Sequence, residues 1–213
     1  MKQNTMKQRI RLTEGQLIRI NEIVADTVNE YVNENLNNSN VLYHNTTMEN
    51  LMYIMKDDAM ASNYHRGYKN GETHNGICFT RSQKYYPYTN QFVQIEFDAN
   101  KISKYARGLK LIPYQDPKWK SLDEYEERLV SSNGNPFILQ PISQMVKSVN
   151  INLDRMISYI EGYYEDTEEY EHALKEAFEK NIFGDKLKIV NGPNGKNIVQ
   201  FDEALKELDS LSY

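Results

Sequence analysis

The sequence predicts a single α+β domain, in which a mixed or mainly antiparallel sheet follows an N-terminal helix and precedes a helical C-terminal extension. Three observations predict this fold class. Residues 41–151 contain several short apolar segments separated by turns, with one or two short helical patterns among them. Residues before 36 and after 152 instead carry apolar side chains at helical spacing. With 213 residues, the chain can bury one sizeable core but has little room for two.

The first element is a helix predicted over residues 14–35. Thr13 and Gln16 have the spacing of a capping box, in which two side chains satisfy backbone N–H groups at a helix start. The apolar residues that follow at helical spacing are Leu17, Ile20, Ile23, Val24, Val28 and Tyr31. The polar run 35–40 ends the helix, because short polar side chains compete for backbone hydrogen bonds. We assign residues 1–38 to a helical arm, whose alternative roles are packing on the domain, docking and oligomerisation.

The predicted core, residues 39–153, begins with a strand over residues 41–44, so His44 lies at a strand end. Thr46 and Glu49 form a second capping box, which predicts a short helix after this strand. Residues 61–75 show no period and contain Gly, Asn and His, which predicts a loop.

Further strands are predicted over residues 76–80, 91–97 and 109–112. In the second of these, apolar and polar residues alternate, which indicates a strand with one buried and one exposed face. The expected buried residues are Val93, Ile95 and Phe97, and the expected exposed residues are Gln94 and Glu96.

An acidic segment, residues 123–127, leads into an apolar strand over residues 128–130, so carboxylates stand at a strand entrance. Residues 137–139 and 146–151 add two more strand segments. Only short helices separate these strands, which favours a mixed or antiparallel sheet over a doubly wound one.

Residues 154–213 are predicted to form helices and a β-hairpin that pack on the core. The pattern is helical over residues 153–182, and its acidic part, residues 161–171, is expected to be a solvated surface. Asn194 and Gly195 lie between two apolar runs, which is a strong hairpin signal. A last helix is expected over residues 202–208.

Composition narrows the possible function classes. The formal net charge of -5 supplies no general field for binding nucleic-acid phosphates. The single cysteine, Cys78, cannot close an internal disulfide or build a structural zinc site, and it lies in an apolar strand. No apolar stretch approaches the length of a membrane span. We therefore expect a cytoplasmic protein with no metal and no membrane partner.

Four segments in order resemble the catalytic domain of ADP-ribosyltransferases of the diphtheria-toxin and poly(ADP-ribose) polymerase branch. The first contains Leu42, Tyr43, His44, Asn45 and Thr46, followed by a helix. The second contains Gly76, Ile77, Cys78 and Phe79, followed by Ser82, Tyr85 and Tyr86. The third is the alternating strand 92–98, and the fourth runs from Glu126 to Val130, with a later strand over residues 145–151. The resemblance covers residues 41–153 and implies the split antiparallel or mixed sheet of that family.

The resemblance also implies the chemistry of the site, with NAD as a substrate. Cleavage of the bond between nicotinamide and ribose builds positive charge on the sugar, which a nearby carboxylate stabilises. Glu127 or Glu126 would bond the ribose 2′-hydroxyl, and strand alternation allows one of the two to face the cleft. We favour Glu127, which shares a face with Leu129. His44 would donate to a ribose hydroxyl or position the amide.

The remaining NAD contacts follow from the same resemblance. Asn45 stands where the family has a glycine whose backbone holds the nicotinamide amide, and Thr46 follows it. Tyr85 or Tyr86 would stack on the nicotinamide ring. Arg81 would bind the pyrophosphate and Ser82 the carboxamide. Alternatively, Arg81 pairs with Glu126 or Glu127 in a structural ion pair.

The function implied is that of an NAD-dependent mono-ADP-ribosyltransferase that modifies a host protein or nucleic acid. Short bacterial and phage members are similar at residues 80–82 and 123–127, which implies a phage-encoded or toxin-like protein in a bacterial or infected-host cytosol. Two alternatives stay open. Asn45, Cys78 and the acidic face are compatible with an inactive binding or inhibitor protein of the same fold. The helical arm is compatible with a virion or assembly component.

Overall fold

The computed structural model describes residues 40–66, 73–81, 90–113, 126–131, 133–163, 165–192 and 195–211. The chain divides into two compact units, Met1–Ser39 and Asn40–Tyr213, and the described residues all belong to the second. The helix expected over residues 14–35 therefore lies outside the described residues.

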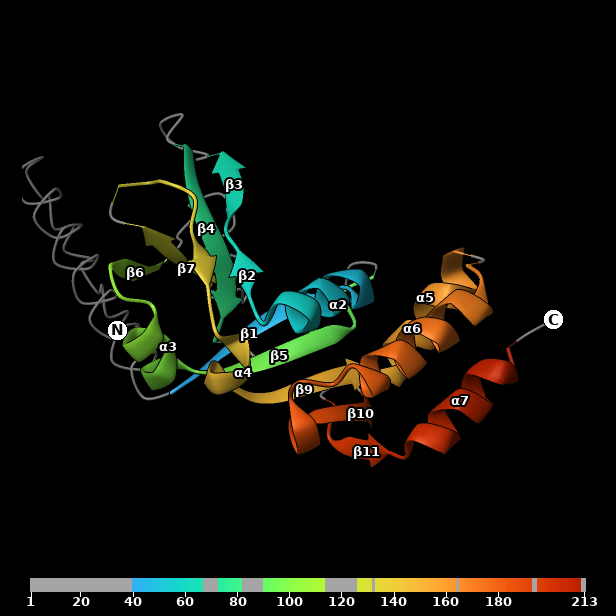
Figure 1. The fold of residues 1–213 in the computed structure, drawn as a ribbon. Coiled ribbons are helices and arrows are strands. Elements are labelled where there is room, and N and C mark those ends of the chain that lie inside the picture. The colour runs from blue at the N-terminus through green and yellow to red at the C-terminus, as the bar shows by residue number, and fades with distance from the viewer. Residues whose placement is uncertain are drawn as a thin grey trace, which may run out of the picture. The chain divides into compact units, whose positions relative to one another are not determined.

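Within these residues, nine strands form one mixed sheet, in the order β11-β10-β9-β5-β1-β4-β7-β6 with β3 paired to β4 (Figure 1). Their bounds are β1 Val41–Thr46, β3 Asn63–Arg66, β4 Thr73–Thr80, β5 Val93–Asp98, β6 Leu109–Pro113, β7 Glu126–Ser131, β9 Val146–Asn152, β10 Leu187–Asn191 and β11 Asn197–Val199. Neighbouring strands are antiparallel, except that β9 and β10 are parallel. A separate pair joins β2 (Met60–Ala61) to β8 (Ile138–Leu139). The predicted α+β class with a mixed, mainly antiparallel sheet is confirmed.

The described helices are α2 Met48–Asp57, α3 Ala99–Tyr105, α4 Ile142–Met145, α5 Leu153–Tyr163, α6 Thr167–Glu179 and α7 Phe201–Asp209. A 3-10 turn, η2, covers Gly184–Lys186. Helix α6 packs against both α2 and α7. One buried core joins the sheet to the helices, and it includes Leu42, Ile95, Leu51, Met156 and Leu208.

Several sequence predictions are confirmed at the level of single elements. In β5, Val93, Ile95 and Phe97 are fully buried, as expected. The C-terminal hairpin is present as β10 and β11, and β10 extends the central sheet by pairing with β9. Gln94 is 1% exposed, although it was predicted to face solvent. It lies between Asn45 and Asn150 in a row of polar side chains across three strands, and it donates to Asn45 Oδ1 at 3.0 Å.

The predicted start of α2 is wrong by one residue. Thr47, and not Thr46, is the N-cap, because its hydroxyl accepts a hydrogen bond from the Asn50 N–H at 3.1 Å. Thr46 instead continues β1, opposite Val93, and is 3% exposed.

The loop predicted over residues 61–75 is also wrong in part. Strand β3 pairs with the first half of β4, Asn63 opposite Gly76 and Arg66 opposite Thr73. These strands escape sequence analysis because neither carries the apolar alternation that marks a half-buried strand. Helix α3 was not predicted either, although Asp98 caps it by accepting from the backbone of Asn100 and Lys101.

Strand pairing within the sheet is interrupted where β1 meets β4, and we refer to this interruption as the split. Strand β1 pairs with β5 along its whole length but meets β4 at one position, Tyr43 opposite Thr80. In the part of the chain that the structure describes, the edge of β1 beyond Tyr43 thus has no strand partner on the β4 side. A space opens there between β1, β4 and α2.

We expect Asn152→Ala to lower the free energy of unfolding by about 2 kcal/mol. Asn152 is fully buried, its amide donates to the Gly192 carbonyl at 2.9 Å, and its Oδ1 caps α5 by accepting from the Arg155 N–H at 3.1 Å. Urea denaturation measures the loss. Asn150→Ala on the same strand is the control, with an expected loss below about 1 kcal/mol because Asn150 is only part-buried. Equal losses for the two variants would contradict this account.

Candidate functional site

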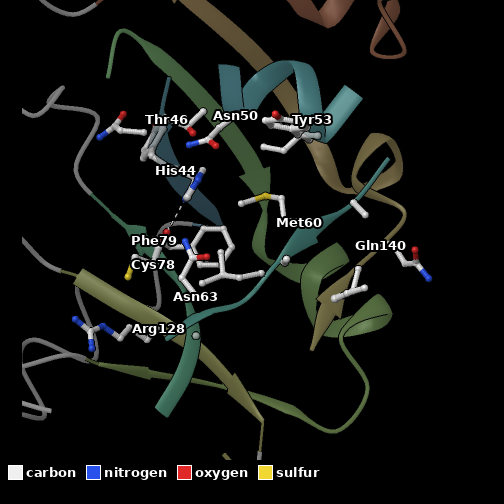
Figure 2. Close-up of a pocket in the computed structure, with 18 of the residues that line it drawn as sticks. His44, Thr46, Asn50, Tyr53, Met60, Asn63, Cys78, Phe79, Arg128 and Gln140 are labelled. Carbon is white, nitrogen blue, oxygen red and sulfur yellow. Dashed lines mark hydrogen bonds between the residues drawn. The ribbon is translucent and has the colours of Figure 1, made fainter. Parts of the chain in front are cut away.

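The space beside the split forms a pocket with a volume of about 920 Å³, within the range of small-molecule sites (Figure 2). Its walls come from β1, α2, β2 and β4. Residues from other elements complete the lining, namely Asn63, Gln91, Arg128, Ile138 and Gln140.

His44 lines this pocket from β1, and its tautomer follows from one hydrogen bond. Its Nδ1 lies 2.8 Å from the Cys78 carbonyl oxygen. Because a carbonyl oxygen can only accept, Nδ1 carries the proton and donates. In the neutral ring Nε2 is then an acceptor, and no residue in the described part of the chain hydrogen-bonds to it. Burial lowers the pKa of His44 from its usual value of 6.5, and the bond to the Cys78 carbonyl opposes this shift only in part.

In this tautomer, Nε2 accepts a hydrogen bond from a ligand hydroxyl, while a donor role at Nε2 requires the protonated ring. The ring edge also packs on Phe79, with centroids 6.0 Å apart. The imidazole is therefore held by β4 on one side and open to a ligand on the other.

Glu127 lies on β7 directly opposite Phe79 of β4, and it is 5% exposed. Residues directly opposite each other in a sheet project from the same face. Phe79 therefore separates Glu127 from His44, at a distance of two strand spacings, roughly 10 Å. Glu127 is not among the described residues that line the pocket, although its neighbour Arg128 on β7 is.

Arg81 forms a bidentate ion pair with Glu127. Its Nε donates to Oε1 at 2.8 Å, and one terminal nitrogen donates to Oε2 at 3.1 Å. Both groups are largely buried: counting side-chain atoms alone, Arg81 is 12% exposed and Glu127 is 7% exposed. The structure thus has the ion pair, the alternative that the sequence analysis left open for Arg81, and it selects Glu127 as the partner.

Arg128, which follows Glu127 on β7, is 5% exposed and lines the pocket. In the sheet it is paired with Cys78 of β4. Figure 2 shows its guanidinium group directed away from His44. Sequence analysis did not consider Arg128, because it reads as one position of an apolar strand.

Asn45 and Thr46 both line the pocket, but their side chains leave β1 on opposite faces. Asn45 lies opposite Gln94 and is oriented by it, whereas Thr46 shares the face of His44. The Asn45 Nδ2 group is buried, and among the described residues it has no hydrogen-bond partner.

The backbone of Glu126 lies at the start of β7, opposite Thr80. Ser82, Tyr85 and Tyr86 lie outside the described residues. Their predicted contacts with NAD therefore stay predictions.

Most of the pocket wall was not predicted from the sequence. Asn50, Tyr53 and Asp57 line the pocket from one side of α2. Their spacing of three and four residues was the signal that could have placed them on one helix face. Met60 and Gln140 join them from segments with no recognisable motif.

The described residues contain no group of three or more His, Cys, Asp or Glu side chains that could hold a metal ion. Cys78 forms no disulfide and is partly buried. In the segments that the structure describes, no helix has both the length and the apolar character needed to cross a membrane.

Comparison with known proteins gives no relative: no protein-family model, no curated protein and no solved structure matches the chain.

We expect Arg81→Ala to lower the free energy of unfolding by about 3 kcal/mol, because it leaves the buried Glu127 carboxylate unpaired. Urea denaturation measures this, and adding Glu127→Gln should restore part of the loss. Lys147→Ala is the control, since Lys147 is 44% exposed and pairs with Glu96 at 3.5 Å. Its expected cost is below about 1 kcal/mol. A double variant no more stable than Arg81→Ala would show that the two side chains are not coupled.

We expect His44 to titrate below 6.5 and to be protonated on Nδ1 in its neutral form. Ring ¹⁵N shifts over a pH series measure both, with His44→Gln to assign the signal. Since the pKa is lower in the folded than in the unfolded protein, the unfolded state binds the extra proton first. Stability should therefore fall as pH drops below 6.5 and level off below the folded pKa, relative to His44→Gln. A pKa above 6.5 would contradict the buried neutral ring.

Proposed function

We propose that this chain is an NAD-dependent mono-ADP-ribosyltransferase that modifies a protein or nucleic-acid acceptor. One observation carries the proposal: His44 and Glu127 project from the same sheet face on either side of Phe79, next to a pocket of about 920 Å³. Polar side chains on the face that otherwise holds the core require a reason, because burying them costs free energy. A ligand that contacts both groups supplies one.

The two groups fit the charge that develops in the reaction. The bond between nicotinamide and ribose C1 breaks, nicotinamide leaves as a neutral molecule, and C1 takes on positive charge. The acceptor nucleophile then bonds to C1 and releases its proton. A carboxylate at the ribose 2′-hydroxyl stabilises this charge, and Glu127 supplies that carboxylate. His44 Nε2 accepts from a second hydroxyl and so orients the ribose.

The ion pair with Arg81 is compatible with this role. A carboxylate has about four lone-pair sites, and Arg81 uses one on each oxygen. Glu127 can therefore hold Arg81 and still accept a hydrogen bond from a ribose hydroxyl. Arg81 fixes the carboxylate in one orientation. Phe79 is 2% exposed, so a ligand that reaches the carboxylate from the His44 side has to displace the side chains packed over Phe79.

The split in the sheet also supports the proposal. Beyond Tyr43, Asn45 and Thr46 line the pocket where β4 has separated from β1, and alternate residues of β1 direct their backbone groups to that side. Such groups can bind an amide as a neighbouring strand would. An ADP-ribosyltransferase-like split sheet is part of the proposed function. As part of the same proposal, the protein is phage-encoded or toxin-like and acts in a bacterial or infected-host cytosol.

Nicotinamide release from NAD, with and without a host lysate and a labelled adenylate group, tests the proposal. We expect Glu127→Gln to lower the rate by about 10²-fold or more, because the transition state loses its nearest charge. His44→Ala should lower it by about tenfold or more. The matched control is Glu96→Gln, which makes the same change in the same sheet on the face that carries Tyr43.

No release and no labelling by the wild type, with Glu126→Gln and Glu127→Gln indistinguishable from it, would overturn the proposal. Circular dichroism and unfolding midpoints on each variant separate loss of chemistry from loss of fold. A rate that falls equally in Glu96→Gln would show that Glu127 has no special role.

A second candidate is a non-catalytic binding protein with the same pocket. Arg81 engages both Glu127 oxygens, and Asn45 and Cys78 stand where the family resemblance has a glycine and a tyrosine. This candidate predicts a stoichiometric partner, captured from lysate equally well by wild type and Glu127→Gln, with no nicotinamide release by either.

A further inference from the structure

Helix α2 forms one wall of the pocket, and this wall extends past His44. Asn50, Tyr53 and Asp57 are spaced by three and four residues, so they lie one above another on the helix face that borders the pocket. Figure 2 shows Asn50 between His44 and Tyr53, with Phe79 on the opposite side of His44. The pocket therefore has two ends, one at Phe79 and one at Tyr53.

The Tyr53 end of the pocket has two exposed large side chains. Tyr53 is 57% exposed, and Ile138, which lines the same pocket from β8, is 62% exposed. Tyr53 packs on no other aromatic ring in the segments that the structure describes. A flat face with no partner, at the wall of a pocket, is suited to stacking on a planar ligand group.

The neighbours of Tyr53 narrow the choice of ligand group. One turn before it lies the Asn50 amide, and one turn after it lies the Asp57 carboxylate. A purely apolar ligand would leave these polar groups without hydrogen-bond partners. A heterocycle with hydrogen-bonding edges satisfies them while its face stacks on the ring.

We propose that Tyr53 is the stacking platform for the purine base of an adenine nucleotide, with Asp57 accepting a hydrogen bond from the exocyclic amino group of the base. The assignment of this end to adenine rests on the proposed function, which gives the Phe79 end to the nicotinamide ribose. Binding of an adenine nucleotide at Tyr53 does not require that NAD be cleaved.

Calorimetric titration with AMP, ADP-ribose and nicotinamide mononucleotide tests the proposal. Tyr53→Ala should lower the affinity for AMP and for ADP-ribose by about tenfold, as expected for the loss of one base–aromatic stack. Tyr53→Phe should keep the wild-type affinity, and nicotinamide mononucleotide, which has no adenine, should bind all three proteins alike. Tyr163→Ala is the matched control, because Tyr163 is also 57% exposed and does not line the pocket.

Asp57→Asn gives a second readout, by comparing AMP with inosine monophosphate. The wild type should prefer AMP, whose amino group donates to the carboxylate, and the variant should lose that preference. The proposal is overturned if AMP does not bind the wild type, or if Tyr53→Ala and Tyr163→Ala affect it equally. Tyr53-dependent AMP binding without nicotinamide release would instead keep the base site and remove the proposed transferase.

Discussion

The hydrogen bond from His44 Nδ1 to the Cys78 carbonyl joins the two parts of the sheet at the point where they separate. Elsewhere in the described residues, β1 pairs in register with β4 at Tyr43 and Thr80, and the His44 ring packs on Phe79. The split opens the pocket, and this one bond fixes both the position and the tautomer of the imidazole beside it. Fold and site therefore share a constraint: a change that closes the split also fills the pocket, and a change that removes the bond frees His44.

A second constraint acts across the other half of the sheet. Arg81 and Glu127 lie 46 residues apart in the sequence and pair on the core face, where an unpaired charge would cost several kcal/mol. Their pairing holds the carboxylate in a defined orientation next to Phe79. The geometry is that of a preorganised group and not of a mobile surface glutamate, which is the condition for electrostatic stabilisation of a developing charge.

The sequence predicted those elements whose signal is local. The alternation in 91–97 identified β5, and Asn194-Gly195 identified the hairpin, because period and turn chemistry are encoded within a few residues. Strand β3 was missed because its pairing with β4 is polar, and the Thr47 cap was missed because Thr46 has the same capping chemistry one residue earlier. The candidate site divides in the same way. His44 was marked by its place at a strand end, and the Arg81–Glu127 pair was one of the alternatives left open for Arg81. The spacing of Asn50, Tyr53 and Asp57 could have placed them on one helix face, but that this face borders the pocket depends on long-range packing.

A crystal structure of the protein soaked with NAD tests the central claim most directly. The account predicts density for the nicotinamide ribose between His44 and Glu127, with one hydroxyl within hydrogen-bond distance of His44 Nε2 and another within reach of the Glu127 carboxylate. It also predicts that the side chains covering Phe79, which is 2% exposed without ligand, have moved apart. A dinucleotide bound elsewhere, or no dinucleotide bound at saturating NAD, would contradict it.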